Sequence, residues 1–555
     1  MSKRTAGLLL LLFWGSVASA PGRSPSAGTP PRYLADDPLW HDPDNLPSPL
    51  PEERDLSQLY DFIINTFFLR PGGDEEIPEA ANVNTLDEVP DSSWFTNRIG
   101  RKTLSLEELV RGPDQSGGPD PSGPWTVIAG KTQGITPGFR IRDARGDVYF
   151  MKFDPRGHPQ LATSSEVIAT AFFHAFGYYV PENYLVFVRK EQFTIAAEAT
   201  LTDQEGKKRS FTEQDLEQIF RRVEHLPDGT VPALASLRLD GRPIGPFEYW
   251  DVRSDDLNDV FPHQHRRELR GLRLFAAWLN HDDSRSINTL DMYLGEPGAG
   301  HVRHHLIDFG SCFGSGSVKV QSRRAGNEYI LEWGPILKAA VTLGIWDRPW
   351  RRVRYPNYPS IGRFEAEFFQ PERWKPEYPN PAFERMKARD AFWAAKIIAK
   401  FSDEAVGALV EKGRLLNPEA AAYLTDTLLR RRDKILRRYL PAVAPFDEFE
   451  VVGRSGDRSI GFADLASRHR VLEPSSYTYA WYRYDNCRDT SDPLEAVGVV
   501  DSPSVPLPPD DAPFLRLELT RNGTGHRADV YLRQEAGEYR VVGVERHSRQ
   551  DRDDR

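Results

Sequence analysis

The first half of the chain alternates apolar and polar residues in a pattern that predicts a sheet interrupted by one helix. A period of two residues places successive side chains on opposite faces of a sheet. Residues 164–176 instead have the apolar spacing of a helix, which Gly177 is expected to end. The five predicted strands cover residues 125–129, 139–143, 147–153, 184–189 and 193–200.

Beyond residue 200 the pattern becomes mainly helical and then returns to short strands. Helices are predicted at 212–223 and 266–279, followed by a hairpin with arms at 288–294 and 301–307. A stretch rich in Trp, Ala and Arg, 334–439, predicts further helices. After Pro441 a separate small β module is expected, with strands at 446–452, 477–484, 514–519, 529–533 and 539–545.

The N-terminal region carries three successive patterns. Residues 1–20 place Lys3 and Arg4 before a short apolar run and end in small residues, which is typical of a cleaved export signal. Residues 21–54 are rich in Pro, Ser, Gly and Asp, so a disordered linker is expected. Residues 55–69 predict an amphipathic helix that packs its apolar face on the following domain. That face carries Leu56, Leu59, Phe62, Ile63 and Phe67.

Composition and charge narrow the class of protein. The 555 residues, 39% of them hydrophobic, suffice for roughly two to four folded domains. A formal net charge of −10 argues against a nucleic-acid partner. Cys312 and Cys487 are too few for a cysteine zinc site, and free thiols are favoured over one disulfide. With no later segment apolar enough to span a bilayer, we expect an exported protein, periplasmic or secreted, without a transmembrane segment after signal cleavage.

Two short segments carry the chemistry. Residues 281–288 read HDDSRSIN, and twenty residues after Asn288 the sequence LIDFG supplies Asp308. Phosphoryl transfer requires a protein to position an acceptor hydroxyl and to hold metal-neutralised phosphates, so a base, an amide and a second carboxylate must converge. The spacing of these two segments supplies all three groups.

The two segments resemble the catalytic loop and metal-binding turn of the protein-kinase-like superfamily, in its atypical HipA-like, spore-coat-kinase-like and phosphoinositide-kinase-like branches. The resemblance implies that Asp283 is the base and that Asn288 and Asp308 hold Mg²⁺ or Mn²⁺. It also implies that Arg285 offsets charge on the phosphoryl oxygens. Asp282 stands where the family usually has arginine, so anchoring of a phosphorylated activation loop is not expected.

The same resemblance implies a nucleotide site upstream. Lys152, on the third predicted strand, would pair with Glu166 near the start of the helix and position phosphates. A solvated lysine beside an unrelated glutamate is the alternative for the pair taken alone. Gly130 and Gly134 lie where kinases cover the phosphates, although an ordinary hairpin turn explains them nearly as well. A P-loop is excluded because its first glycine would fall on Trp125.

The implied fold is α+β and bilobal, with a β-rich small lobe around one main helix, a helical large lobe and a C-terminal β-rich module. The implied function is ATP-dependent transfer of the γ-phosphoryl group to a protein or small-molecule hydroxyl. The alternative is an exported pseudokinase that acts as a nucleotide- or partner-binding module. The expected parts are a signal peptide (1–20), a disordered linker (21–54), an N-terminal extension (55–123), the small lobe (124–200), the large lobe (201–443), the β-rich module (444–546) and a disordered tail (547–555).

Overall fold

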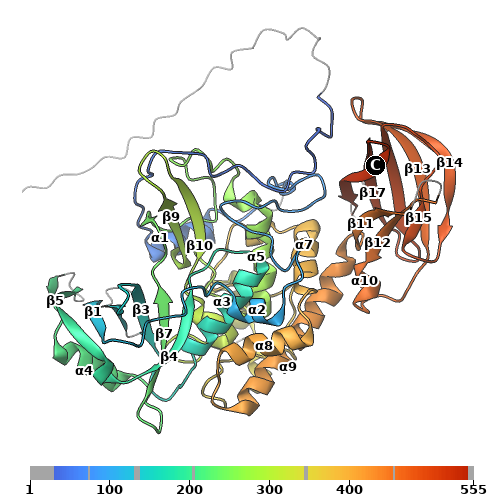
Figure 1. Cartoon of the computed structure of the whole chain (residues 1–555). Coiled ribbons are helices and arrows are strands. Elements are labelled where there is room, and N and C mark those ends of the chain that lie inside the picture. Colours follow the sequence, from blue (N-terminus) through green and yellow to red (C-terminus); the bar gives the residue numbers. More distant parts are fainter. Residues whose placement is uncertain are drawn as a thin grey trace, which may run out of the picture.

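The computed structural model describes residues 30–72, 75–130, 138–202, 207–342, 348–453 and 457–547. The protein is a mixed α+β molecule in which a large sheet, a helical body and a C-terminal pair of sheets follow one another (Figure 1). Among the described residues, no helix combines the length and apolar character needed to cross a bilayer. The predicted signal peptide, residues 1–20, lies outside the described residues.

The large sheet has seven strands in the order β4-β7-β3-β2-β1-β5-β6. Its alternating residues bury one set of apolar side chains, and α4 (Glu213–Arg222) adds Leu216 and Phe220 to the same core. All five strands predicted before residue 200 are confirmed. The strands are β1 (Trp125–Gly130), β2 (Gly138–Arg142), β3 (Val148–Phe153), β4 (Asn183–Val188), β5 (Phe193–Thr202), β6 (Lys208–Ser210) and β7 (Val231–Leu237).

Two strands of this sheet were not predicted, and the sheet therefore extends beyond residue 200, the predicted end of the small lobe. Strand β6 extends the edge beyond β5, and β7 inserts between β3 and β4. The first five residues of β7 are all buried. Leu234 packs on Val167 of the covering helix, while Ala233 and Ala235 join the core on the other face. With both faces covered, β7 shows no alternation of polar residues.

The helical body is built from helices that share the largest core. The helix predicted at 164–176 is confirmed as α3, and the hairpin predicted at 288–307 is confirmed as β9 and β10. The short strand β8 pairs with the free edge of β9. The helices are α2 (Leu106–Arg111), α3 (Thr163–Phe176), α5 (Arg267–Leu279), α7 (Ala388–Ile398), α8 (Asp403–Lys412) and α9 (Pro418–Tyr439). The hairpin sheet contains β8 (Arg242–Pro243), β9 (Thr289–Leu294) and β10 (His301–Leu306).

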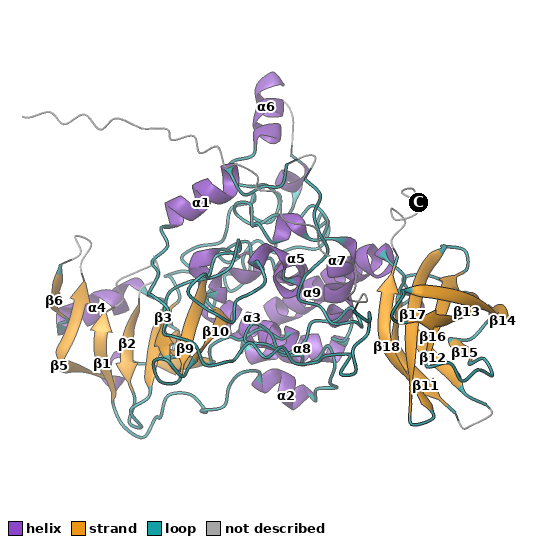
Figure 2. Cartoon of the chain, turned by 90° about the horizontal axis from the view of Figure 1, so that it is seen from above, coloured by secondary structure: helices purple, strands orange, loops and turns teal. Residues whose placement is uncertain are grey.

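Two further helices lie at the surface of the body (Figure 2). The helix predicted at 55–69 is observed as α1 (Gln58–Phe67), and α6 (Trp333–Val341) lies in the region where helices were expected. Helix α1 packs on the body, but mainly through its polar side and not through the apolar face that its spacing predicts. Its buried residues are Asp61 and Asn65, whereas Leu59 and Phe67 are exposed. The polar side is buried because it forms hydrogen bonds with the body, as described below.

After Pro441, where a small β module was predicted, the chain forms two sheets around a core that contains the fully buried Trp481. Three of its strands, β12, β14 and β15, were not predicted. One sheet contains β11 (Phe446–Val452), β12 (Ser459–Asp464) and β15 (Ser504–Pro506). The other contains β13 (Tyr477–Asp485), β14 (Thr490–Val500), β16 (Phe514–Arg521), β17 (His526–Glu535) and β18 (Glu538–Arg546). Cys312 and Cys487 are both free, as expected.

The described part of the predicted linker, residues 30–54, is ordered against the rest of the protein, so the prediction of a disordered linker is wrong there. Tyr33 is buried in the C-terminal module, with its ring 5.2 Å from that of Tyr531. Ser48 pairs with Gly300 in the turn between β9 and β10. Figure 1 shows this segment running from the module to the body. Tyr33 packs in an apolar cluster of the module and Leu50 packs against one in the body, whereas Leu34, Leu39 and Leu46 are exposed. The predicted tail beyond His547 lies outside the described residues.

Candidate active site

A lysine and two carboxylates meet where the large sheet faces the helical body. Lys152 on β3 donates to both oxygens of Glu166, at 3.0 Å each, and to Oδ1 of Asp308 at 2.9 Å. The Glu166 side chain is almost fully buried, that of Lys152 is one-fifth exposed and that of Asp308 is nearly half exposed. Although burial opposes the charge on Lys152, the two carboxylates raise its pKa. Three residues distant in sequence thus form one ionic cluster.

The local sequence places Lys152 and Glu166 opposite each other. Tyr149, Met151 and Phe153 of β3 fill the sheet core, so Lys152 points to the other face. Asp154 then ends the strand and accepts hydrogen bonds from the backbone N–H groups of residues 162 and 163, at 2.9 and 3.0 Å. These bonds hold the first turn of α3, which carries Glu166. Burial raises the pKa of Asp154 to about 6.

Sequence reasoning did not identify Asp154. An aspartate at the end of a strand, a few residues before a helix, is a recognisable capping signal. Its distance of eight residues from Ala162 hid it, because the usual capping residue lies directly before the helix.

The Asp-Phe-Gly triplet is fixed by packing and by backbone geometry. Asp308 has a φ of 62°, in the left-handed region that aspartate tolerates better than most residues. The ring of Phe309 stacks on Phe173 of α3, with centroids 4.6 Å apart. A Cβ atom at Gly310 would lie 3.2 Å from Oε2 of Glu166, so this position favours glycine. The triplet is therefore held against the helix that carries Glu166.

The loop that follows α5 lies beside the triplet. His281 Nδ1 is 2.9 Å from the Ser311 hydroxyl, just beyond the triplet. Asn288 donates from its side chain to the Asp283 carbonyl at 2.8 Å, and its own carbonyl accepts the Ile307 N–H at 3.0 Å. The structure thus brings the loop with Asp283 and Asn288 next to the residue that precedes Asp308. It does so through the β9–β10 hairpin, as the sequence predicted.

Arg285 has carboxylate partners that the sequence did not indicate. It forms ion pairs with Asp283 and, at 2.7 Å, with Oε2 of Glu377. Burial raises the pKa of Asp283 to about 7, with Arg285 opposing and Asp308 adding to the shift. Burial also raises the pKa of Asp282 to about 8, and the neighbouring Asp283 adds to it. The loop is therefore crowded with carboxyl groups around one guanidinium.

A segment from the helical body and one from the N-terminal extension brace this loop. The Glu377 N–H donates to the Asp282 carbonyl at 2.8 Å. Tyr378 donates its hydroxyl to Asp61 of α1 at 2.6 Å, and Ser286 of the loop donates to the same carboxylate at 3.0 Å. No motif or spacing in the sequence pointed to Glu377, Tyr378 or Asp61, because they reach the loop only through the fold.

Of the two glycines predicted to cover the phosphates, Gly130 and Gly134, the structure describes only Gly130. Gly130 is buried at the end of β1, and a Cβ atom there would clash with Leu201 and lie 3.1 Å from Phe211. Packing against these side chains explains the glycine. Gly134 lies outside the described residues.

The oxygen atoms in the site suit a hard divalent cation. The Asp308 side chain is nearly half exposed, although one oxygen binds Lys152. The amide nitrogen of Asn288 donates to the Asp283 carbonyl, so the amide oxygen is the atom that Asn288 can offer to a cation. Carboxylate and amide oxygens are the ligands that Mg²⁺ and Mn²⁺ prefer. The residues present therefore fit the predicted metal.

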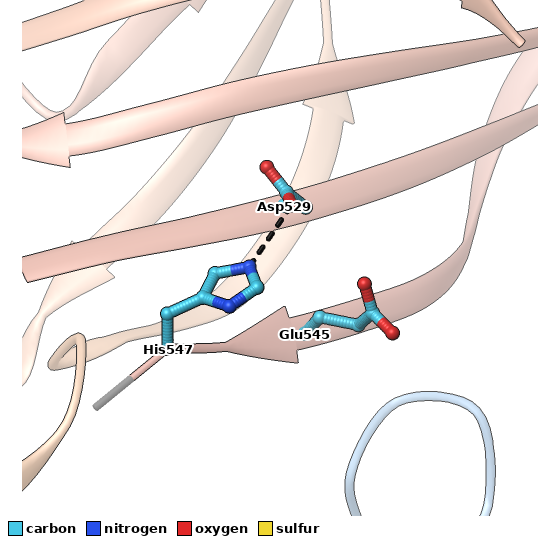
Figure 3. Close-up of side chains that lie close together, drawn as sticks. All are labelled: Asp529, Glu545 and His547. Atoms are coloured by element: carbon cyan, nitrogen blue, oxygen red, sulfur yellow. Dashed lines mark hydrogen bonds and ion pairs between the residues drawn. The ribbon is translucent and has the colours of Figure 1, made fainter. Parts of the chain in front are cut away.

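A second cluster of charged side chains lies in the C-terminal module, and its members pair with other protein groups. Asp529, Glu545 and His547 are the group of described His, Cys, Asp or Glu side chains whose ligand atoms lie close enough for a metal ion. In Figure 3, however, the Glu545 carboxylate points away from the imidazole of His547. Glu545 is paired with Arg32, and Asp529 with His547 at 2.9 Å and Arg527 at 3.1 Å. The carboxylates are thus already neutralised by protein groups.

Comparisons with known proteins give little. No family model matches the chain, and no curated protein matches it. Among solved structures, the Helicobacter pylori proinflammatory kinase CtkA is similar over 57% of this chain and 98% of its own, at 11% identity and a TM-score of 0.28. The site described here therefore rests on the contacts of this chain.

Proposed function

We propose that the protein is an ATP-dependent phosphotransferase with a bilobal, protein-kinase-like fold. The observation that carries the proposal is the contact of Lys152 with both Glu166 and Asp308. A lysine on a sheet that is paired with a helix glutamate and adjoins a metal-binding aspartate is the arrangement that positions nucleotide phosphates in such enzymes. The acceptor is a hydroxyl of a protein or a small molecule.

Each residue has a role that its position supports. Lys152, held by Glu166, binds nucleotide phosphates, and Asp283 accepts the proton of the acceptor hydroxyl. A pKa raised to about 7 suits a general base that works near neutral pH. Arg285 holds Asp283 in place through their ion pair and is anchored in turn by Glu377. This adds a positioning role to the charge-neutralising role that the sequence implied for Arg285.

A divalent cation completes the proposed site. Asn288 and Asp308 would hold Mg²⁺ or Mn²⁺, which supplies charge neutralisation for the phosphates. The chain's own contribution is to hold these two residues together, through the hydrogen bond from the Ile307 N–H to the Asn288 carbonyl.

Nucleotide binding is tested by thermal unfolding with ATP and MnCl₂. A ligand at one hundred times its dissociation constant stabilises the folded state by about 2.7 kcal/mol. We expect a clear rise of the melting temperature in the wild type, and loss of that rise in Asp308→Ala. Asp492→Ala, at an exposed position on β14, is the matched control and should keep it. The absence of any shift in the wild type would contradict the proposal.

Transfer is tested with γ-labelled ATP, by following label on the protein itself and label released as phosphate. Asp283→Ala should keep the ATP-dependent thermal shift and lose about 10²- to 10⁴-fold in transfer rate, the usual worth of a general base. The same loss in Asp492→Ala would show that the effect is not specific to the site.

A second candidate function is a nucleotide-binding module without transfer. The observation that favours it is the ion pair of Arg285 with Asp283, because a carboxylate that already binds a guanidinium is less available to accept a proton from a substrate. Normal ATP binding, with no label on the protein and no release of phosphate from the wild type, would select this function.

We also propose that the protein is exported, periplasmic or secreted, because residues 1–20 have the pattern of an export signal. N-terminal sequencing of the protein from its natural host tests this, and an intact Met1 in the cytoplasmic fraction would contradict it.

A further inference from the structure

Helix α1 has its polarity reversed. A surface helix normally buries its apolar stripe and exposes its polar one. In α1 the buried residues are Asp61 and Asn65, which bond to each other, and Asp61 also binds the body. Phe62 contacts the ring of Tyr378 in the body, with centroids 5.5 Å apart, but the rest of the apolar side faces outward, with Leu59 66% exposed and Phe68, directly after the helix, 70% exposed. Because the polar side is needed for these hydrogen bonds, these exposed apolar side chains are left for a contact outside this chain.

Helix α6 presents a second apolar surface. Figure 2 shows it projecting from the body. Every side chain of α6 that the structure describes is exposed or half-buried, and Trp333 and Val341 are 61% and 83% exposed. An isolated helix of nine residues is marginal in water, so one that projects in this way is expected to be stabilised by a partner.

The two helices belong to one side of the molecule. Arg70, just after α1, lies over the ring of Tyr329 at 5.5 Å. The N–H of Tyr329 donates to Glu332, the residue directly before α6, at 3.2 Å. Of the 21 large apolar side chains that are exposed among the described residues, nine lie on α1, at Phe68 or on α6. Such a concentration of exposed apolar side chains marks an interaction surface, which we name the α1–α6 face.

The charge beside this face indicates what covers it. Residues 348–354 read RPWRRVR, with four arginines and no acidic residue, in a chain whose formal net charge is −10. Arg348 and Trp350 both bind Glu328, at 3.2 and 3.0 Å, four residues before Glu332. The arginine run is thereby held near the base of α6. Exposed apolar helices with tryptophan and adjacent arginines are typical of proteins that lie on anionic membranes.

We propose that the α1–α6 face binds peripherally to a phospholipid surface that carries anionic headgroups. Apolar side chains of α1 and α6 enter the interface, and the exposed Arg351, Arg352 and Arg354 contact the headgroups. The proposal does not depend on phosphotransfer. If the proposed function also holds, Asp61 links this face to the loop of Asp283 through Ser286, so the active site would work close to the lipid surface.

The test is co-sedimentation of the full chain with vesicles of phosphatidylcholine alone, or of phosphatidylcholine with phosphatidylglycerol. We expect binding to the anionic vesicles that weakens with added salt. Leu337→Glu with Val341→Glu, and separately Leu59→Glu with Phe68→Glu, should each lower the partition coefficient at least about tenfold, the worth of removing one or two apolar side chains from an apolar contact.

Two further variants complete the experiment. Arg351→Glu with Arg352→Glu should abolish the preference for anionic vesicles. The matched control is Val497→Glu with Val499→Glu, two comparably exposed valines on β14, which should bind like the wild type. Every variant carries the same residues 1–29, so a contribution of that segment cancels, and circular dichroism checks that each variant is folded.

Three results would overturn the proposal. One is a partition coefficient that the α1 and α6 variants do not lower. Another is a loss of binding in the β14 control as large as in those variants. The last is a concentration-dependent dimer, measured by light scattering, that Leu337→Glu with Val341→Glu dissociates while vesicle binding is absent. That result would assign the α1–α6 face to a second copy of the chain.

Discussion

Replacement of Lys152 by methionine tests whether the ionic cluster with Glu166 and Asp308 is formed as described. Methionine keeps most of the apolar stem and removes the charge. The almost fully buried Glu166 then loses the positive charge of Lys152, whereas the half-exposed Asp308 is solvated by water. The loss of stability should therefore come mainly from Glu166.

The magnitude follows from burial. Breaking a buried ion pair from one side costs about 3–5 kcal/mol, because the remaining charge stays buried. Since Lys152 is one-fifth exposed, we expect the lower end, about 3 kcal/mol. Adding Glu166→Gln removes the stranded charge, so the double variant should recover roughly half or more of the loss.

The assay is urea unfolding of the protein without nucleotide, followed by circular dichroism and calorimetry. Lys190→Met is the matched control, because Lys190 also contacts two glutamates, Glu213 and Glu217, but at the surface. Its unfolding midpoint should stay close to that of the wild type, since exposed ion pairs are screened by water.

The reasoning is refuted if Lys152→Met is as stable as the wild type, or if Glu166→Gln makes the single variant less stable still. Either result would mean that the lysine does not neutralise Glu166 in the folded protein.

Further predictions concern backbone geometry and pH. Gly177→Ala should lower the melting temperature by several degrees, because Gly177 has a φ of 132° and its new Cβ would clash with the ring of Phe95. Gly407→Ala, within α8 and with open space around it, should instead raise stability by about 0.5–1 kcal/mol in urea unfolding. Burial lowers the pKa of both His281 and His305 to about 4, so the unfolded chain binds more protons below pH 6.5. The contribution of these two histidines to stability should therefore be complete above pH 6.5 and fall by about 3 kcal/mol per histidine as the pH drops to 4, and His305→Gln should remove its share of this loss in urea titrations.

In the large sheet, the strands β1, β2 and β3 that the sequence identified alternate between a covered face and a more open one. The alternation in β3 records a buried side and a more open side, whereas α3, in which every residue except His174 is buried, was located from its apolar residues and from the Gly177 that ends it. Both elements were located to within a residue or two. Strand β7 was not predicted, because both its faces are covered and its residues do not alternate between polar and apolar. Helix α1 was located correctly, but its orientation was predicted wrongly, because the hydrogen bonds of Asp61 decided it and no local pattern encodes them.

The candidate site divides in the same way. Lys152, Glu166, Asp283, Asn288 and Asp308 were selected because a family resemblance in residue type and spacing implied their roles. Spacing within one hairpin even predicted that the Asn288 loop and Asp308 would be neighbours. The residues that hold these groups in place are not limited to one type in this way. Glu377 was therefore identified only from the tertiary structure, and the capping signal of Asp154 was missed because eight residues separate it from Ala162.

The sequence by itself determined many of the helices and strands and the candidate charged groups of the site, because each leaves a local signature in residue type or period, but it missed β6, β7, β12, β14 and β15. Tertiary structure alone decided that Lys152 bridges two carboxylates, that Glu377 holds Arg285, and that α1 turns its apolar side outward. Those outcomes depend on contacts between residues up to hundreds of positions apart, whose free energies no local window of sequence contains.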